Sequence, residues 1–204
     1  MKLKLSKWRI ISVIPGIFVI VSYYTFTFIS LALCPSPISP LDNWLSDLGN
    51  SSYNPNGAIF YNIGCILTGS ALFIFYIGMY KFYRKEIWHK ILVITNQTVG
   101  ICSGFALIML GLYSEDFMEP HMIWAGLFFW LNLIVLILAN IILLFHEDFM
   151  KPISIYGLSV AGINVIFVII TSFSVLIPLL EWITVFTALG YVGLIVFNIY
   201  RKLD

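Results

Sequence analysis

Long apolar stretches separated by short polar connections dominate this chain. Asp, Glu, Lys and Arg are absent from these stretches, except for Glu181 at the start of the last one. Each has the roughly 20 apolar residues that a helix needs to cross the hydrocarbon core of a bilayer. The pattern predicts an all-α polytopic membrane protein, one domain over residues 1–204 that forms a six-helix bundle, with spans at about 10–33, 58–80, 91–113, 121–145, 153–176 and 181–200.

The composition excludes several classes of protein. Hydrophobic types make up 60% of the residues and charged types 10%, whereas a soluble domain carries about 25% charged residues. A net charge of +1 without a basic stripe speaks against a nucleic-acid partner. Three cysteines among long apolar runs exclude a secreted disulfide scaffold. Membrane lipids are therefore the expected partners, and protein partners stay open.

The basic residues indicate the orientation. All 11 lie in the N-terminal segment, the second and fourth connections and the C-terminal segment, and the other three connections have none. Because Lys and Arg are retained on the cytoplasmic side, both termini are expected in the cytoplasm, in a multi-pass protein of the cell membrane. One alternative is that residues 2–32 are a cleaved signal peptide, but their apolar run exceeds the usual 7–15 residues, which favours a retained first helix.

The first outer connection, residues 34–57, is the only one long enough to hold structure. Ser39 can cap a helix, Pro40 fits its first position, Asp42 completes a capping box and Gly49 can end it. These signals predict a short amphipathic helix at the outer interface. Its apolar face would consist of Leu41, Trp44, Leu45 and Leu48, at helical spacing.

Candidate chemistry gathers on the same outer side, which holds six carboxylates and no basic residue. We expect a site made from Ser46, Asp47, Asp116 and His121. Asp47, Asp116 and His121 could hold a divalent metal such as Zn²⁺ that activates water. Alternatively, Ser46 is a nucleophile, His121 its base and a carboxylate the orienting group. Asp47 falls at the C-terminal end of the predicted short helix, where an anion is unfavourable by roughly 0.3–1 kcal/mol, and that flags it as functional.

Short motifs around these residues resemble domain-of-unknown-function family 998, a group of small six-helix prokaryotic membrane proteins. The resemblance covers nearly the whole chain and implies the six-helix fold. It picks out Ser46, Asp47, Asp116 and His121 but implies no activity. Ser114 departs from the family pattern, which has Pro there. The matching elements are Ser46-Asp47-Leu48-Gly49, Asn62-Ile63-Gly64, Gly69, Gly111 to Asp116, His121 and Ala125-Gly126.

Two functions from different classes follow from these features. The first is an enzyme that acts on a lipid or lipid-linked headgroup at the outer leaflet through the outward-facing Asp/His site. The second is a non-catalytic membrane subunit or lipid-binding scaffold, in which the polar outer residues only solvate the loops. No ionisable residue lies at mid-membrane, which argues against an ion-coupled transporter. A transporter of a neutral solute is the third reading and ranks below the other two.

Overall fold

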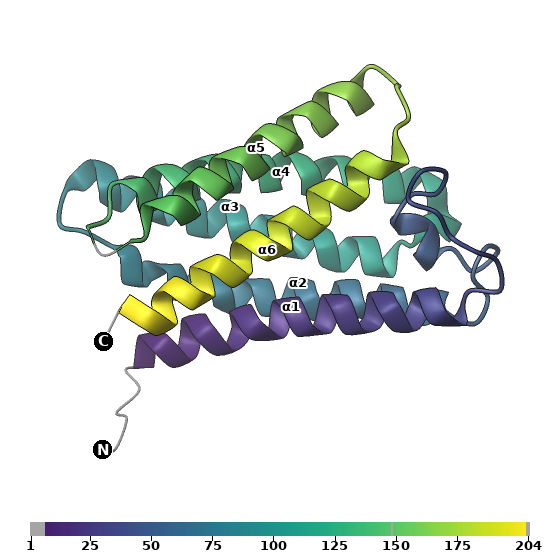
Figure 1. Ribbon diagram of the computed structural model, residues 1–204, viewed down its shortest axis with the longest axis horizontal. Helices are drawn as coiled ribbons and strands as arrows, with labels where there is room; N and C mark the ends of the chain where they lie inside the picture. The colour runs from purple at the N-terminus through teal and green to yellow at the C-terminus, as the bar shows by residue number, and fades with distance from the viewer. Residues whose placement is uncertain (1–6, 148, 203–204) are drawn as a thin grey trace.

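The computed structural model describes residues 7–147 and 149–202, and that part of the chain is all-helical. All six long helices are apolar and long enough to cross a membrane. The predicted six-helix polytopic bundle is confirmed, and the chain is a multi-pass membrane protein. The helices, shown in Figure 1, are α1 (Lys7–Leu33), α2 (Ala58–Gly78), α3 (Ile87–Leu112), α4 (Met118–Leu144), α5 (Lys151–Ser172) and α6 (Pro178–Lys202).

Five of the six helices begin two to four residues earlier than the apolar pattern predicts. The expected starts of α1, α3, α4, α5 and α6 were residues 10, 91, 121, 153 and 181. Helical geometry continues into the polar flanks, where hydropathy carries no signal. Pro120 and Pro152 fall within the first turn of α4 and α5. Proline is tolerated there because the N–H groups of the first turn have no partner within the helix.

Consecutive helices pack side by side, and α6 returns to contact α1 (Figure 1). A close backbone approach that needs glycine lies between α2 and α3. A Cβ atom on Gly69 would lie 2.5 Å from the carbonyl oxygen of Gly104. Small residues at such crossings let helix backbones meet, which is how membrane bundles gain van der Waals contact.

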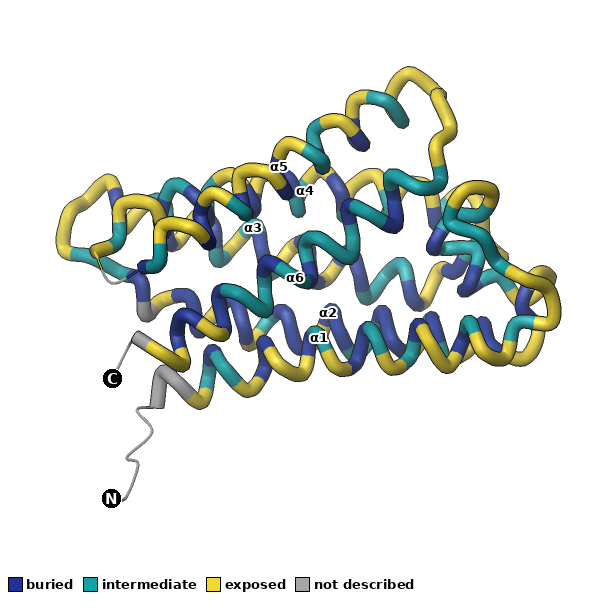
Figure 2. Tube along the Cα trace, in the orientation of Figure 1, coloured by how far each residue is buried: buried dark blue, intermediate teal, exposed yellow. Residues whose placement is uncertain are grey.

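Burial follows the inward faces of the helices, whereas large apolar side chains are exposed on the outside (Figure 2). Ile14, Ile123 and Ile155 are each at least 60% exposed. In water such a surface would be an aggregation liability, but acyl chains solvate it. The outward faces of the helices are therefore the lipid-facing surface.

The two ends of the bundle differ in charge. The basic end carries every basic residue that the structure describes and holds both chain ends (Figure 1). There the Arg84 guanidinium donates to the Phe145 carbonyl at 2.8 Å and to Glu147 at 3.3 Å, which ties two connections together. The acidic end consists of residues 34–57, 113–121 and 173–181, and it contains six carboxylates and no Lys or Arg.

The loop at the acidic end departs from the predicted helix. A single turn at Ser39 is followed by a short 3-10 helix, η1 (Ser46–Gly49), so the predicted helix from Ser39 is wrong in start and type. The amide oxygen of Asn43 accepts the Ser39 N–H at 3.2 Å, the bond expected of Asp42. Leu45 and Leu48 are completely buried, whereas Leu41 is 69% exposed. Burial of two leucines against the bundle outweighs continuation of the first turn, because each contributes about 2 kcal/mol.

Buried amides fasten this loop to the helices beneath it. The Asn54 side-chain N–H₂ donates to the Ser30 carbonyl and to the Leu48 carbonyl, both at 3.1 Å, and its oxygen accepts the Gly57 N–H at 3.0 Å. The Asn62 amide donates to the Gly49 carbonyl at 3.0 Å. These bonds satisfy loop backbone groups that no regular element pairs.

Labelling of single cysteines tests the orientation. In a variant without Cys34 and Cys102, Ser52→Cys places a thiol at the acidic end and Lys85→Cys one at the basic end. We expect a membrane-impermeant maleimide to label position 52 in intact cells and position 85 only after lysis, because the positive-inside rule keeps the basic end in the cytoplasm. The opposite labelling pattern would contradict this orientation.

Asn54→Ala should destabilise the loop. It removes the Asn54 donor from the Ser30 carbonyl and one of two partners from the Leu48 carbonyl and from the Gly57 N–H. The expected loss is about 2 kcal/mol of unfolding free energy. Thermal unfolding of the purified protein measures it, and protease cleavage within residues 34–57 should appear at a lower temperature. Ser52→Ala is the matched control, because Ser52 is exposed and bonds through its backbone N–H. Equal stability of both variants would refute the anchoring role of Asn54.

Candidate functional site

A small polar cavity lies beneath the loop at the acidic end. Its volume is about 30 Å³, which is room for two or three water molecules. Its walls come from α1, η1, α2, α3, η3, α4 and α6, so residues distant in sequence meet there. The polar side chains that line it are Tyr23, Ser46, Tyr61, Asn62, Cys65, Glu115, His121 and Glu181.

Of the four residues predicted for a site, Ser46 and His121 line this cavity and Asp47 and Asp116 do not. The structure thus brings together one hydroxyl and one imidazole from the predicted set. The two carboxylates predicted beside them are engaged with backbone and side-chain donors of the loop.

Asp47 closes the turn that leads into η1. One carboxylate oxygen accepts the Trp44 N–H at 3.0 Å and the Asn43 side-chain amide at 3.3 Å. It stands in the first turn of η1 rather than at the C-terminal end of a helix. The expectation that Asp47 opposes its local electrostatics is therefore wrong, since an anion is favourable near a helix start.

Asp116 connects two loops at the surface. One oxygen accepts the Ser51 N–H at 2.9 Å and the Ser51 hydroxyl at 2.7 Å, and the other accepts the Ser114 hydroxyl at 2.9 Å. Asp116 belongs to η3 (Glu115–Phe117) and is exposed. Its bonds hold η3 against the loop that carries η1.

The predicted metal ligands are not grouped. Within residues 7–147 and 149–202, no three His, Cys, Asp or Glu side chains lie together in an arrangement that could hold a metal ion. Asp47, Asp116 and His121 each have separate partners instead. The geometry gives the divalent-metal hypothesis no support.

His121 sits in the first turn of α4 and is 6% exposed. Its Nδ1 lies 3.0 Å from the Tyr113 carbonyl oxygen. Because a carbonyl can only accept, Nδ1 must carry the proton of this bond, and in the neutral imidazole Nε2 then has the free lone pair. The contact with Tyr113 thus fixes the tautomer and leaves Nε2 able to accept a proton.

Glu181 is a site residue that the sequence analysis did not select. It lies in the first turn of α6, is 7% exposed, and its Oε2 accepts the Leu45 N–H at 2.7 Å. The signal that could have found it was its position as the one acidic residue at the edge of a predicted span, which is a functional flag by default.

Glu115 is the second carboxylate that lines the cavity. The Asn50 side-chain amide donates to its Oε2 at 3.3 Å, and Ser46 and Asp47 are further polar neighbours. Nearby carboxylates repel one another, and no Lys or Arg lies at this end to offset them. The cavity therefore presents carboxyl oxygens and no Lys or Arg, and it favours occupants that bring hydrogen-bond donors.

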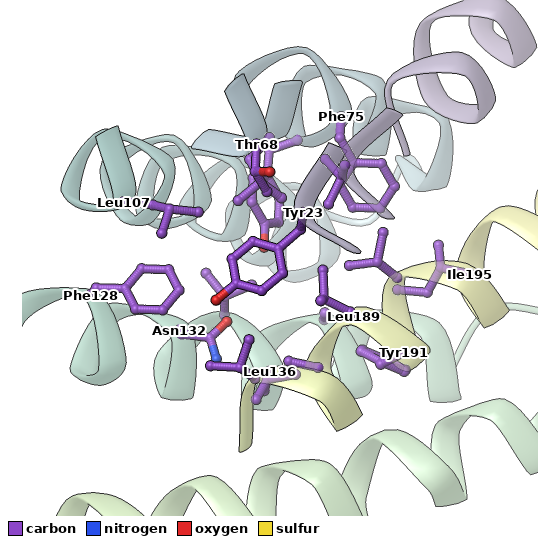
Figure 3. A pocket seen from close by; sticks show the side chains of 18 of the residues that line it. Tyr23, Thr68, Phe75, Leu107, Phe128, Asn132, Leu136, Leu189, Tyr191 and Ile195 are labelled. Atoms are coloured by element: carbon purple, nitrogen blue, oxygen red, sulfur yellow. The ribbon is translucent and has the colours of Figure 1, made fainter. Parts of the chain in front are cut away.

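A second, larger cavity of about 70 Å³ continues into the bundle. It shares Tyr23, Leu107, Phe128, Phe129 and Val185 with the polar cavity, so the two adjoin along one wall. Most of its other lining is apolar, and Figure 3 shows the polar ends of Tyr23 and Asn132 directed into it. The Tyr23 hydroxyl pairs with that of Tyr61 at 3.1 Å, at the boundary between the two spaces.

Comparison with known protein families shows which family the chain matches. The model of the family described as "Protein of unknown function (DUF998)" matches residues 17–198. No curated protein and no solved structure matches the chain. The matched range contains every residue of the polar cavity.

Glu181→Ala should destabilise the closed loop more than Glu181→Gln. Alanine leaves the buried Leu45 N–H without an acceptor, at an expected cost of about 2 kcal/mol, whereas glutamine keeps a carbonyl oxygen at that position. Thermal unfolding of the two purified variants measures the difference. Glu119→Ala, at an exposed glutamate of the same end, is the control and should unfold like the wild type. Equal effects of alanine and glutamine at position 181 would exclude the anchoring role.

Proposed function

The chain belongs to the DUF998 family of proteins of unknown function, so its activity has to be argued from its own residues, and we propose that it is a membrane enzyme acting on the polar head of an amphiphilic molecule. The reaction would occur in the polar cavity at the acidic end. The apolar cavity would hold the start of the hydrophobic chain.

The observation that carries this proposal is the shared wall of the two cavities. Polar groups on one side and apolar groups on the other match the two parts of a lipid-like molecule. Binding sites are typically apolar pockets with a few convergent polar groups that fix orientation. The Tyr23–Tyr61 pair lies where the head would give way to the chain.

His121 is the expected general base. Its Nε2 is the nitrogen left to accept a proton, and the Tyr113 carbonyl holds the ring in that orientation. Glu115 is the carboxyl partner that lines the same cavity, and the Ser46 hydroxyl lies there as a hydrogen-bonding group or nucleophile. An acid and a base converging on one enclosed space provide for proton transfer, which contributes about 10²–10⁴ in rate.

A second candidate is a non-catalytic lipid-binding scaffold. The observation that favours it is that Asp47, Asp116 and Glu181 all accept backbone N–H groups of the loop. Their carboxylates are explained by architecture alone. Glu115 and His121 line the cavity and are not explained by such bonds, so these two residues distinguish catalysis from binding.

Incubation with natural lipids tests the enzyme. The protein in nanodiscs is mixed with a total lipid extract, and mass spectrometry records species that disappear and appear. We expect conversion by the wild type and a loss of at least 100-fold in the initial rate for His121→Gln and Glu115→Gln, because each removes a proton-transfer group.

Glu119→Gln is the control for this experiment. It makes the same chemical change at an exposed glutamate near Glu115 and should convert lipids at the wild-type rate. Unfolding temperatures of all variants separate loss of chemistry from loss of structure. Equal conversion rates for the wild type and a folded His121→Gln variant would contradict the catalytic proposal. Retention of lipid without conversion would favour the non-catalytic scaffold.

A further inference from the structure

The polar cavity is selective by charge. Glu115 and Glu181 line it, and no Lys or Arg occurs anywhere at the acidic end. A phosphate or carboxylate head would be buried there with no Lys or Arg to offset its own charge, which is costly. Carboxylates accept hydrogen bonds and hydroxyl groups donate them, so a neutral head with several hydroxyl groups suits this space.

Thr184 supplies a second point of recognition, one turn beyond Glu181 on α6. It is completely buried, lines the apolar cavity, and its hydroxyl oxygen has no partner in the described part of the chain. Thr187 on the same helix behaves differently, since its hydroxyl donates to the Ile183 carbonyl at 2.6 Å. A buried hydroxyl without a partner is costly, so a polar atom of an occupant would be stabilised beside it.

Asn132 extends this polar zone from α4. It lies four residues, about one helical turn, beyond Phe128 in the shared wall, and its amide is directed into the cavity (Figure 3). Thr184 directly precedes Val185 in the same wall. A hydroxyl and an amide N–H₂ near the junction are donors for a carbonyl oxygen placed between head and chain.

Size limits the occupant to one chain. The cavities measure about 70 Å³ and 30 Å³, where one water needs about 10–15 Å³. That space takes a small head and the first carbons of a single chain. A lipid with two acyl chains side by side does not fit.

We infer that the ligand is a neutral single-chain amphiphile whose hydroxyl-bearing head is joined to its chain through a carbonyl group. The head would lie against Glu115 and His121, and the carbonyl would accept from Thr184 and Asn132. This inference rests on the proposed function for the placement of the head, and it adds the substrate class.

Binding to the full chain in nanodiscs, which avoids competing detergent, tests this class. The probes are 1-monooctanoylglycerol, its ether analogue 1-O-octylglycerol, and octanoate. Native mass spectrometry reads the bound fraction at matched concentrations in the disc lipid. We expect the ester to bind about tenfold more tightly than the ether, which lacks only the carbonyl, and octanoate to bind at least tenfold more weakly than the ester.

Thr184→Val is the decisive variant, because valine keeps the shape and removes the hydroxyl. It should weaken ester binding about tenfold and leave ether binding unchanged, whereas the control Thr187→Val should alter neither. Equal binding of ester and ether by the wild type, or octanoate bound as tightly as the ester, would overturn the inference.

Measuring the same probes on His121→Gln separates this inference from the proposed enzyme. Suppose that the variant binds the ester with the stated preferences and that the wild type converts neither the ester nor any natural lipid. The proposed enzyme activity is then wrong, and the proposed ligand class is supported. If natural lipids are converted but the ester does not bind, the ligand class fails and catalysis stands.

Discussion

The hydrogen bond from the Leu45 N–H to the Glu181 carboxylate, 2.7 Å long, is the contact on which the acidic end depends. It joins the loop after the first helix to the start of the last. The Trp182 indole N–H reinforces it by donating to the Asn43 carbonyl at 2.9 Å. Because Ser46 directly follows Leu45, this contact also brings the Ser46 hydroxyl to the cavity wall.

Six carboxylates at one end without a Lys or Arg need an explanation, and for three of them backbone donors provide it. The loop over the bundle has little regular structure, so its N–H groups lack partners of their own. Asp47, Asp116 and Glu181 accept these N–H groups. The loop at the acidic end is thus held by bonds from its backbone N–H groups to side-chain carboxyl oxygens. Glu115 stands apart because the donor to its Oε2 is the side-chain amide of Asn50, at 3.3 Å.

The six spans could be predicted because a bilayer requires about 20 apolar residues in every crossing, and that requirement is readable without tertiary contacts. The meeting of Ser46 and His121 was also predictable, since both lie beside spans at the same end. The hydrogen-bond partners of Asp47 and Asp116 could not be predicted from the sequence. Whether a carboxylate turns toward a backbone N–H or toward the cavity depends on the conformation of the loop. In the sequence Glu181 marks only the boundary of a span. In the structure it is buried and accepts the Leu45 N–H, which holds the loop in place.

The acidic residues have different roles, and these roles determine which of them can take part in a reaction. A carboxylate that holds backbone N–H groups cannot turn toward a ligand without opening the loop, and an open loop would admit water to the cavity. Glu115 and His121 are free of that constraint, since neither accepts a backbone N–H. Glu115 lies in η3 and His121 in the first turn of α4, and both line a cavity that adjoins the apolar one. Closure by Glu181 therefore keeps this pair in a low-dielectric environment, where hydrogen bonds to an occupant are strongest.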